Sequence, residues 1–147
     1  MVNETVVVFG ASGFLGSHVA DALSAAGNRV RLFDRSPSPY LKSNQEMIIG
    51  DIMNLDQVIE AAKGTSVVYN FAAIADIDEA NDKPIPTATI NVLGNMHALE
   101  AARIAGARRF VFASSIYVYS ESGSFYRASK QAAERFTETY HERYGLD

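Results

Sequence analysis

Short apolar runs and longer helical patterns alternate along this chain. The apolar runs are rich in Val, Ile and Phe, and polar and apolar positions do not alternate within them. Strands with this pattern are buried on both faces, as they are in a parallel sheet. We expect five such strands, at Thr5–Phe9, Arg29–Phe33, Glu46–Ile49, Ser66–Ala72 and Arg109–Ala113.

The stretches between the strands have helical spacing and helical start and stop signals. We expect helices over Phe14–Ala26, Leu55–Ala62, about Thr87–Ala105 and about Tyr126–Tyr144. Asn54, with Gln57 three residues on, is typical of a helix start. The glycines typical of helix ends are Gly27, Gly64 and Gly106.

The order of these elements predicts a doubly wound α/β fold. Strands joined by right-handed crossovers give a parallel sheet of the Rossmann type, with the strand order 3-2-1-4-5. Two stretches, Ser36–Gln45 and Ile74–Pro86, interrupt the pattern, and we expect both to be irregular. Either can border a ligand cleft at the carboxyl ends of the strands, and for the first of them a solvated connector is the alternative.

Composition places the chain among ordinary globular domains. Its 147 residues correspond to about one domain, with 48% hydrophobic and 20% charged residues. A formal net charge of -4 argues against nucleic acid or an anionic membrane as a partner. The absence of cysteine excludes disulfides and thiol catalysis. No signal peptide and no membrane-spanning run is visible, so we expect a cytoplasmic protein.

Three glycines follow the first strand, in the sequence Gly10-Ala11-Ser12-Gly13-Phe14-Leu15-Gly16. We expect Gly10 to turn the chain off the strand, Gly13 to admit a pyrophosphate, and Gly16 to let the helix pack closely on the sheet. The helix N-terminus then offers free N–H groups to the phosphates. A flexible turn is the alternative, but the position between a strand and a helix favours a dinucleotide-binding turn.

Asp34 ends the second strand, 18 residues after Gly16. A carboxylate there accepts hydrogen bonds from the adenosine ribose and repels a 2′-phosphate, which favours NAD over NADP. Arg35 can offset that repulsion, and a turn-forming Asp is the alternative. Weaker signals follow the next two strands, where turn and packing roles are the alternatives; these are Asp51-Ile52 and Phe71-Ala72-Ala73.

Tyr126 and Lys130 lie four residues apart at the start of the last predicted helix, so they share one face. An ammonium beside a phenol favours the phenolate, which suits a general acid/base that interconverts a carbinol and a ketone. Ser115, at the end of the fifth strand, can hold the reacting oxygen. The alternatives are a surface tyrosine, a solvated lysine and a turn serine, and for Asn91 a cap or surface position.

Together these residues resemble a known family. The chain is similar to the extended short-chain dehydrogenase/reductases, in particular the NAD-dependent epimerase/dehydratase group that acts on nucleotide sugars. The matching pieces run in the family's order: Gly10–Gly16, Asp34, Asp51-Ile52, Ala72-Ala73, Asn91–Asn95, Ser114–Tyr119 and Tyr126–Lys130. The resemblance implies that Tyr126 exchanges the hydroxyl proton, that Lys130 binds the nicotinamide ribose and assists Tyr126, and that Ser115 bonds the reacting oxygen.

The resemblance also implies NAD as the cofactor, with NADP less favoured. It places Asp51 and Ile52 at the adenine. The expected cofactor-binding residues are Gly10, Ser12, Gly13, Phe14, Leu15, Gly16, Asp34, Arg35, Asp51, Ile52, Phe71, Ala72, Ala73, Asn91 and Lys130. No metal site is expected, because the three histidines fall in separate parts of the chain.

Two features depart from the family's pattern. Members usually continue with a smaller C-terminal domain that holds the nucleotide sugar, so we expect residues 1–147 to be the dinucleotide-binding domain of a longer protein. Only 10 residues separate Ser115 from Tyr126, and the segment Ser120–Phe125 is short and flexible in pattern. In addition, Ile116-Tyr117 stands where the family's 4,6-dehydratases carry an Asp-Glu pair, which favours an epimerase or a simple dehydrogenase.

The expected function is that of an NAD-dependent oxidoreductase or epimerase of a nucleotide-linked sugar, inactive as residues 1–147 alone. A non-catalytic dinucleotide-sensing module and a reductase of a non-sugar ketone are the alternatives. We also expect a homodimer through the helices that begin near Thr87 and Tyr126. The outer-face residues, which alternatively face the sheet, are Met96, Leu99, Phe136 and Tyr140.

Overall fold

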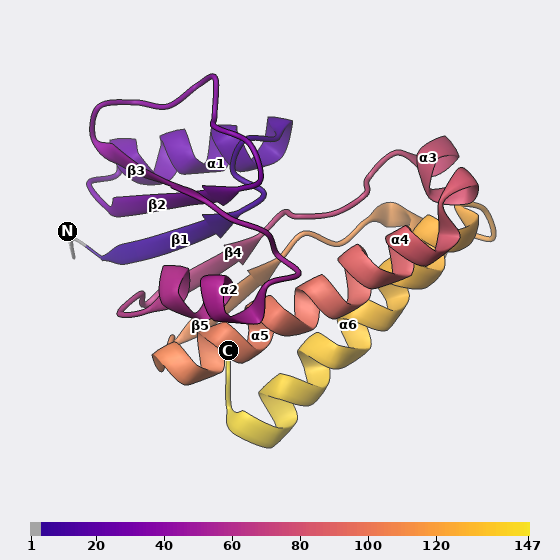
Figure 1. Cartoon of the computed structure of the whole chain (residues 1–147). Coiled ribbons are helices and arrows are strands. Elements are labelled where there is room, and N and C mark those ends of the chain that lie inside the picture. Colours follow the sequence, from indigo (N-terminus) through magenta and orange to yellow (C-terminus); the bar gives the residue numbers. More distant parts are fainter. Residues whose placement is uncertain (1–3) are drawn as a thin grey trace.

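A computed structural model of the chain describes residues 4–147. The first three residues, on which the expectation of no signal peptide partly rests, lie outside the described residues. Five strands form one parallel sheet in the order β3-β2-β1-β4-β5 (Figure 1). The predicted Rossmann-type fold is therefore confirmed. The strands are β1 (Thr5–Phe9), β2 (Arg29–Asp34), β3 (Gln45–Ile49), β4 (Val67–Asn70) and β5 (Arg109–Phe112).

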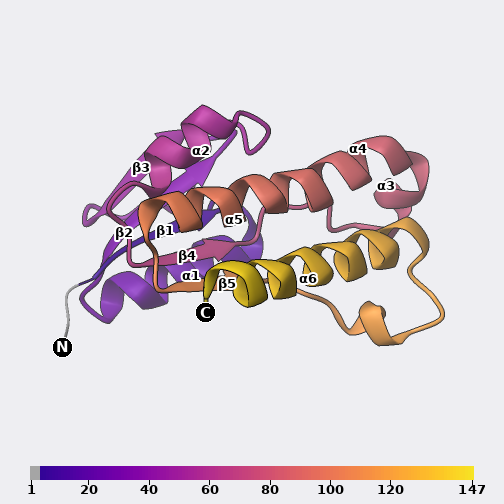
Figure 2. The same cartoon turned by 90° about the horizontal axis from the view of Figure 1, so that it is seen from below.

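Helices cover both faces of the sheet. One face carries α1 (Phe14–Ala25), and the other carries α2 (Leu55–Ala62), α5 (Gly94–Ala105) and α6 (Ser124–Tyr144) (Figure 1). Figure 2 shows α5 and α6 side by side. The shorter helical segments are α3 (Ile77–Asp82), α4 (Pro84–Ala88), a π-helical turn at Thr89–Leu93 and a 3₁₀ turn at Ile116–Tyr119.

The core consists of two apolar clusters, one on each side of the sheet. Alternate residues of β1 point to opposite faces, so Val8 packs with Leu32 on the α1 side and Val7 packs with Leu99 on the α5 side. This is why β1 is a continuous apolar run. Burial on both faces fixes the register of this strand, because a one-residue slip would exchange the two clusters.

The register aligns the carboxyl ends of the strands. Phe9 lies opposite Phe33 on one side and Asn70 on the other, and Asn70 lies opposite Phe112. The segments that follow the strands therefore leave the sheet along one edge. In open α/β sheets that edge forms the ligand crevice.

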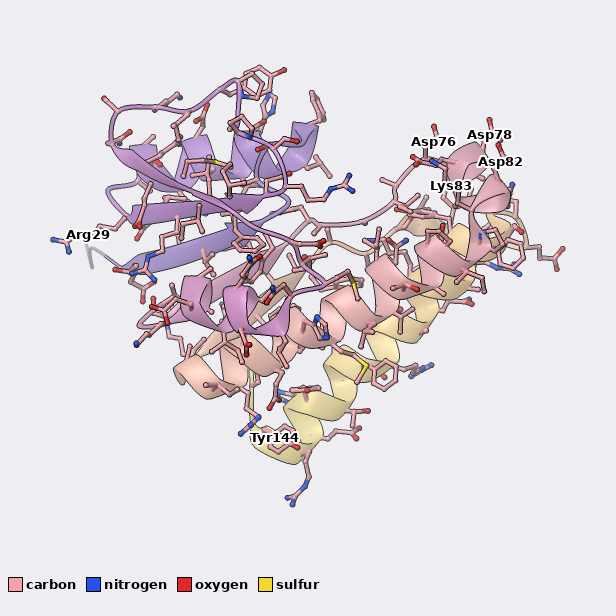
Figure 3. The ribbon with its side chains drawn as sticks, in the orientation of Figure 1. Arg29, Asp76, Asp78, Asp82, Lys83 and Tyr144 are labelled. Carbon is pink, nitrogen blue, oxygen red and sulfur yellow. The ribbon has the colours of Figure 1, made fainter. Side chains whose placement is uncertain are left out.

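The expectation that Ile74–Pro86 is irregular was wrong. The segment contains α3, whose N-cap Asp76 accepts a hydrogen bond from Glu79 N at 2.9 Å. Acidic side chains at the start of a helix stabilise it, because their negative charge lies at the positive end of the helix dipole. Figure 3 shows the side chains of Asp76 and Asp78 at the tip of the molecule. Pro84 begins α4 instead of ending a loop, because the first turn of a helix needs no N–H at that position.

The expected outer face of the last two helices needs correction as well. Leu99 is fully buried in the core between α5 and the sheet. Tyr140 packs partly against the same core, and its hydroxyl donates to Glu100 Oε2 at 3.0 Å. Phe136 on α6 is 37% exposed, and Leu93, in the π-helical turn just before α5, is 43% exposed.

The predicted start of α2 is confirmed in detail. Asn54 Oδ1 accepts a hydrogen bond from Gln57 N at 3.2 Å, which satisfies one of the free donors of the first turn. The Gln57 side chain accepts a bond from Asp51 N at 2.9 Å, so the cap also ties the helix to the end of β3. Among residues 4–147, no helix combines the length and the apolar character needed to cross a membrane.

Candidate active site

The turn after β1 requires glycine at two positions. Gly10 has a φ of 74°, and a Cβ there would lie 2.5 Å from Ala72 N. A Cβ on Gly16 would lie 2.2 Å from Gly10 O, so this glycine lets the start of α1 approach the turn closely while the rest of the helix packs on the sheet. These approaches bring the start of α1, the turn and the end of β4 together, backbone against backbone.

The N-terminus of α1 points out of this turn without a local counter-charge. Its N-cap is Gly13, no side chain caps it, and its first turn holds no acidic residue. Phe14 and Leu15 are exposed. Ser12 is used elsewhere, because its N–H donates to Asp34 Oδ2 at 3.0 Å and its hydroxyl donates to Ser36 O at 2.6 Å. The helix end thus offers main-chain N–H groups and a positive dipole to an anion.

A cleft of about 260 Å³ opens in front of the turn, at the carboxyl ends of the strands. Nine of the expected cofactor residues line it: Gly10, Gly13, Asp34, Arg35, Asp51, Ile52, Phe71, Ala72 and Ala73. The structure adds lining residues that the sequence analysis missed: Phe33, Gly50, Met53, Ile74 and Ile90. Of these only Gly50 carries a sequence signal, as a glycine directly after a strand, and a Cβ there would lie 2.5 Å from the Phe33 ring.

Six expected cofactor residues do not line the cleft: Ser12, Phe14, Leu15, Gly16, Asn91 and Lys130. Gly16 acts through packing. Phe14 and Leu15 are the first two residues of α1, where the main-chain N–H groups have no side-chain cap. Lys130 and Asn91 lie on the helices behind and are described below.

The carboxylate of Asp34 lies at the rim of the cleft and also holds the local backbone. Its Oδ2 accepts from Ser12 N, and its Oδ1 accepts from Ser36 N at 3.3 Å. The turn-forming alternative is therefore part of what this residue does. Since a carboxylate offers about four lone-pair sites, it retains acceptor capacity toward the cleft. Asp51 is arranged in the same way, because its Oδ1 accepts from Met53 N at 2.9 Å.

Tyr126 and Lys130 are buried on one face of α6, which rules out the surface alternative for both. Their exposed fractions are 9% and 4%. Lys130 Nζ donates to Ala113 O at 2.9 Å, just past the end of β5, and lies 5.8 Å from the centre of the Tyr126 ring. It also lies 4.9 Å from the centre of the Phe112 ring. An ammonium has three donors, so Lys130 retains hydrogen-bonding capacity toward a ligand.

Lys130 is held in the charged form only at a cost. Burial lowers the pKa of this ammonium to about 8. No carboxylate among residues 4–147 forms an ion pair with it, so no opposite charge offsets the loss of hydration. Strongly shifted groups of this kind are typical of functional sites.

Ser115 caps the 3₁₀ turn that follows β5. Its Oγ accepts a hydrogen bond from Tyr117 N at 3.3 Å, as the turn alternative anticipated. The Tyr117 ring meets the Tyr126 ring edge-on, with centroids 6.3 Å apart. The 3₁₀ turn therefore places Ser115 at the end of β5 and packs the residues after it against the start of α6.

The segment Ser120–Phe125, expected to be flexible, is held in place. Arg127 Nη1 donates to Ser120 O at 2.7 Å, and Gln131 Nε2 donates to Val118 O at 2.8 Å. Gly123 has a φ of 97°, and a Cβ there would lie 2.9 Å from the Tyr117 ring. A short connection is therefore sufficient here, because the side chains of α6 bind its backbone.

Asn91 lies in the π-helical turn and is buried, so it is neither a cap nor a surface residue. Its Oδ1 accepts from Ile74 N at 2.7 Å, and its Nδ2 donates to Ile74 O at 3.0 Å and to Ser129 Oγ at 2.9 Å. The side-chain amide of Asn91 is therefore hydrogen-bonded to protein atoms. Asn91 thus supports the cleft wall at Ile74 from behind.

The sequence profile of the NAD dependent epimerase/dehydratase family matches residues 6–147. The chain belongs to this family. Among curated relatives, it is 34% identical over 119 residues to a 3-beta-hydroxysteroid dehydrogenase of Mycolicibacterium neoaurum, which covers 75% of this chain and 31% of that protein. It is 32% identical over 124 residues to a UDP-glucose 4-epimerase of Rhizobium leguminosarum bv. trifolii, which covers 81% of this chain and 38% of that epimerase.

Solved structures of epimerases share the fold. A UDP-glucose 4-epimerase of Thermus thermophilus, solved as a complex with NAD, matches with a TM-score of 0.87 and 29% identity over 97% of this chain and 52% of that one. The chain thus spans between about a third and about a half of the length of these relatives. The family is NAD-dependent, which confirms NAD as the cofactor expected from the sequence.

Residues 4–147 hold no group of three or more His, Asp or Glu side chains arranged to bind a metal ion. The ring nitrogens of the three histidines lie next to main-chain carbonyls instead. His18 Nδ1 is 2.8 Å from Phe14 O, and His97 Nδ1 is 2.9 Å from Ile52 O.

We expect Lys130→Met to stabilise the free protein at pH 7. The folded state disfavours the ammonium, whose pKa of about 8 lies below the ordinary value of 10.5. The penalty is thus fully present below pH 8 and is relieved as the pH rises from 8 toward 10.5. The variant should gain up to about 3 kcal/mol in the free energy of unfolding at pH 7.

The measurement is urea unfolding of both proteins at pH 7, 9 and 10, with NAD affinity determined in parallel. The advantage of the variant should shrink as the pH rises, and its affinity for NAD should fall. Parallel pH profiles of the two proteins would contradict the buried, unpaired lysine.

Proposed function

We propose that residues 1–147 are the cofactor-binding part of an NAD-dependent oxidoreductase or epimerase that acts on a nucleotide-linked sugar. The observation that carries this proposal is the pair Tyr126 and Lys130, buried on one face of α6 and held near the end of β5 by the bond from Lys130 to Ala113 O. A module that only senses a dinucleotide has no need of a buried lysine without a carboxylate partner. The family membership and the relatives named epimerases support the same conclusion.

The cleft fits a dinucleotide along the strand order. Asp34 and Asp51, after β2 and β3, would meet the adenosine half, with Asp34 accepting from the ribose hydroxyls. The turn at Gly10 and the N-terminus of α1 would meet the pyrophosphate, because no Cβ fills the space in front of them. The nicotinamide half then extends over β4 and β5, toward Lys130.

The residues of α6 would provide the acid/base chemistry. When bound, NAD supplies a hydride acceptor and, once reduced, a hydride donor. Tyr126 would take the proton of the sugar hydroxyl as the carbinol is oxidised, while Lys130 binds the nicotinamide ribose and favours the phenolate by its charge. Ser115 would hold the reacting oxygen. In an epimerase the keto intermediate would rotate in the site before Tyr126 returns the proton.

The substrate assignment rests on the relatives and on the segment after Ser115. Ile116 and Tyr117 stand where an acid pair would favour dehydration, so oxidation or epimerisation is the better supported reaction. The relatives are longer than this chain. We therefore place most of the sugar-binding residues outside residues 1–147.

A reductase or dehydrogenase of a non-sugar substrate is the second candidate. The 34% identity to a 3-beta-hydroxysteroid dehydrogenase favours it. So does the exposure of two large apolar side chains, Ile116 and Tyr119, directly after Ser115. Reduction of NAD by the full-length protein with UDP-sugars or with a hydroxysteroid distinguishes the two candidates.

We expect the chain to bind NAD and to show negligible sugar epimerisation by itself. It should bind NADP at least about 30-fold more weakly, because Asp34 repels the 2′-phosphate by about 2 kcal/mol. Calorimetry with both cofactors measures the ratio. Asp34→Asn should reduce the preference for NAD over NADP, whereas Asp56→Asn, at an exposed position of α2, should leave it unchanged. Equal binding of NAD and NADP by the wild type would show that Arg35 outweighs Asp34.

In the full-length enzyme, Tyr126→Phe should lower kcat by at least about 100-fold, since it removes only the proton-transferring hydroxyl. The affinity for NAD and the melting temperature should change little. Tyr140→Phe is the matched control, because its hydroxyl bonds Glu100 on the outer side of α5. Turnover of Tyr126→Phe close to that of the wild type would remove Tyr126 from the mechanism.

We further propose a homodimer through α5 and α6, which lie side by side (Figure 2). Leu93, in the π-helical turn just before α5, and Phe136 on α6 remain exposed, whereas Leu99 is buried and Tyr140 is partly buried. Light scattering should give twice the monomer mass, and Phe136→Lys should shift the protein to the monomer. A monomer at high concentration in the wild type would count against this contact.

A further inference from the structure

Two buried asparagines join the end of β4 to α6 through α5. Asn70 is the last residue of β4 and Asn95 lies in the first turn of α5, and their exposed fractions are 2% and 1%. Asn70 Nδ2 donates to Asn95 Oδ1 at 2.9 Å. Neither side chain lines the cleft, so neither has been assigned a part in the chemistry above.

The two amides form a chain of hydrogen bonds with only one possible direction. At one end, Ala72 N–H can only donate, and it donates to Asn70 Oδ1 at 3.1 Å. At the other end, Ala133 O can only accept, and Asn95 Nδ2 donates to it at 3.4 Å. Each amide therefore has to present its oxygen toward β4 and its nitrogen toward α6. Asn95 Nδ2 also lies 3.4 Å from Thr137 Oγ1 on α6.

The two ends of this series of hydrogen bonds lie at the cleft and at α6. Ala72 lines the cleft and touches the turn at Gly10, where a Cβ would lie 2.5 Å from its nitrogen. Ala133 lies three residues after Lys130, on the same helix as Tyr126. The hydrogen bonds thus run from the wall of the cleft to the helix that carries the proposed acid/base pair.

Packing alone does not explain a pair of buried amides. Apolar side chains of the same size would fill this space without the cost of burying polar groups. What an amide adds is direction, because its hydrogen bonds hold only when both partners keep their distance and orientation. Catalytic groups in turn tolerate little displacement, since an error of about 1 Å can cost a factor of about 100 in rate.

We propose that Asn70 and Asn95 are positioning residues, which fix the position of α6 relative to the wall of the cofactor cleft at Ala72. The inference rests on the proposed function, because it concerns how Lys130 is presented to the nicotinamide half of NAD. The adenosine half lies over β2 and β3, away from this chain of bonds. Loss of the pair should therefore act on one half of the cofactor only.

The test is calorimetric binding of NAD and of AMP to the full chain, with Asn95→Leu and Asn95→Asp. The Leu variant leaves Asn70 Nδ2 without an acceptor, and the Asp variant keeps that acceptor but presents an oxygen to Ala133 O. Both variants should bind NAD at least about tenfold more weakly than the wild type and AMP within about twofold of it. Binding is measured well below the melting temperature of each variant.

Asn28, just before β2 at the amino ends of the strands, offers a matched control. Its Oδ1 accepts from Glu4 N at 3.3 Å and its Nδ2 donates to Leu23 O at 3.1 Å, so the bonds are of the same kind. Asn28→Leu should lower the melting temperature without changing the ratio of NAD to AMP affinity. If Asn95→Leu does not fold, Thr137→Val, which removes one of the two acceptors of Asn95, should shift the ratio in the same direction.

An unchanged ratio in the folded Asn95 variants, with normal NAD binding by the wild type, would overturn the positioning role and leave the proposed function standing. A ratio that also changes in Asn28→Leu would show a general effect of stability and would overturn it too. Failure of the wild type to bind NAD while it still binds AMP would remove the proposed function, and this inference with it.

Discussion

The close passage of the backbone at Gly10 past the end of β4 is the constraint on which the cleft depends. A Cβ at Gly10 would lie 2.5 Å from Ala72 N, and one at Gly16 would lie 2.2 Å from Gly10 O. Because main chain meets main chain at both contacts, neither can relax by a change of rotamer. The start of α1, the turn and the wall at Ala72 are therefore fixed relative to one another before any ligand arrives.

The second element of the site is held at a cost to stability. Lys130 has exchanged water for one carbonyl, Ala113 O, and two aromatic rings. A charge buried in this way weakens the folded state, and such sites are common where function requires a group that packing alone would exclude. The rigid turn follows β1, the central strand, and Lys130 lies near the end of β5, two strands away, so the strand order sets the distance between them.

The sequence was sufficient for features that depend on local pattern. Apolar runs identified the five strands, and the glycine spacing identified the turn. It was insufficient where tertiary contacts decide. The helix α3 begins at an Asx cap that was read as loop, Leu99 faces the core although its helix has two possible faces, and Ser120–Phe125 is ordered by side chains of α6. The Asn70–Asn95 pair joins residues 25 positions apart, and no local signal marks it.

The π-helical turn at Thr89–Leu93 fixes how many residues the chain has between the cleft wall and α5. A π turn bonds each residue five positions on, so it holds one residue more than the α-helical turn it replaces. Deleting one residue here would leave an α-helical turn, and the rewound backbone would carry Asn91 out of its place opposite Ile74. Insertions and deletions among related chains should therefore avoid this stretch. They should accumulate in Ser36–Gln45, which connects two strands and is not part of a helix.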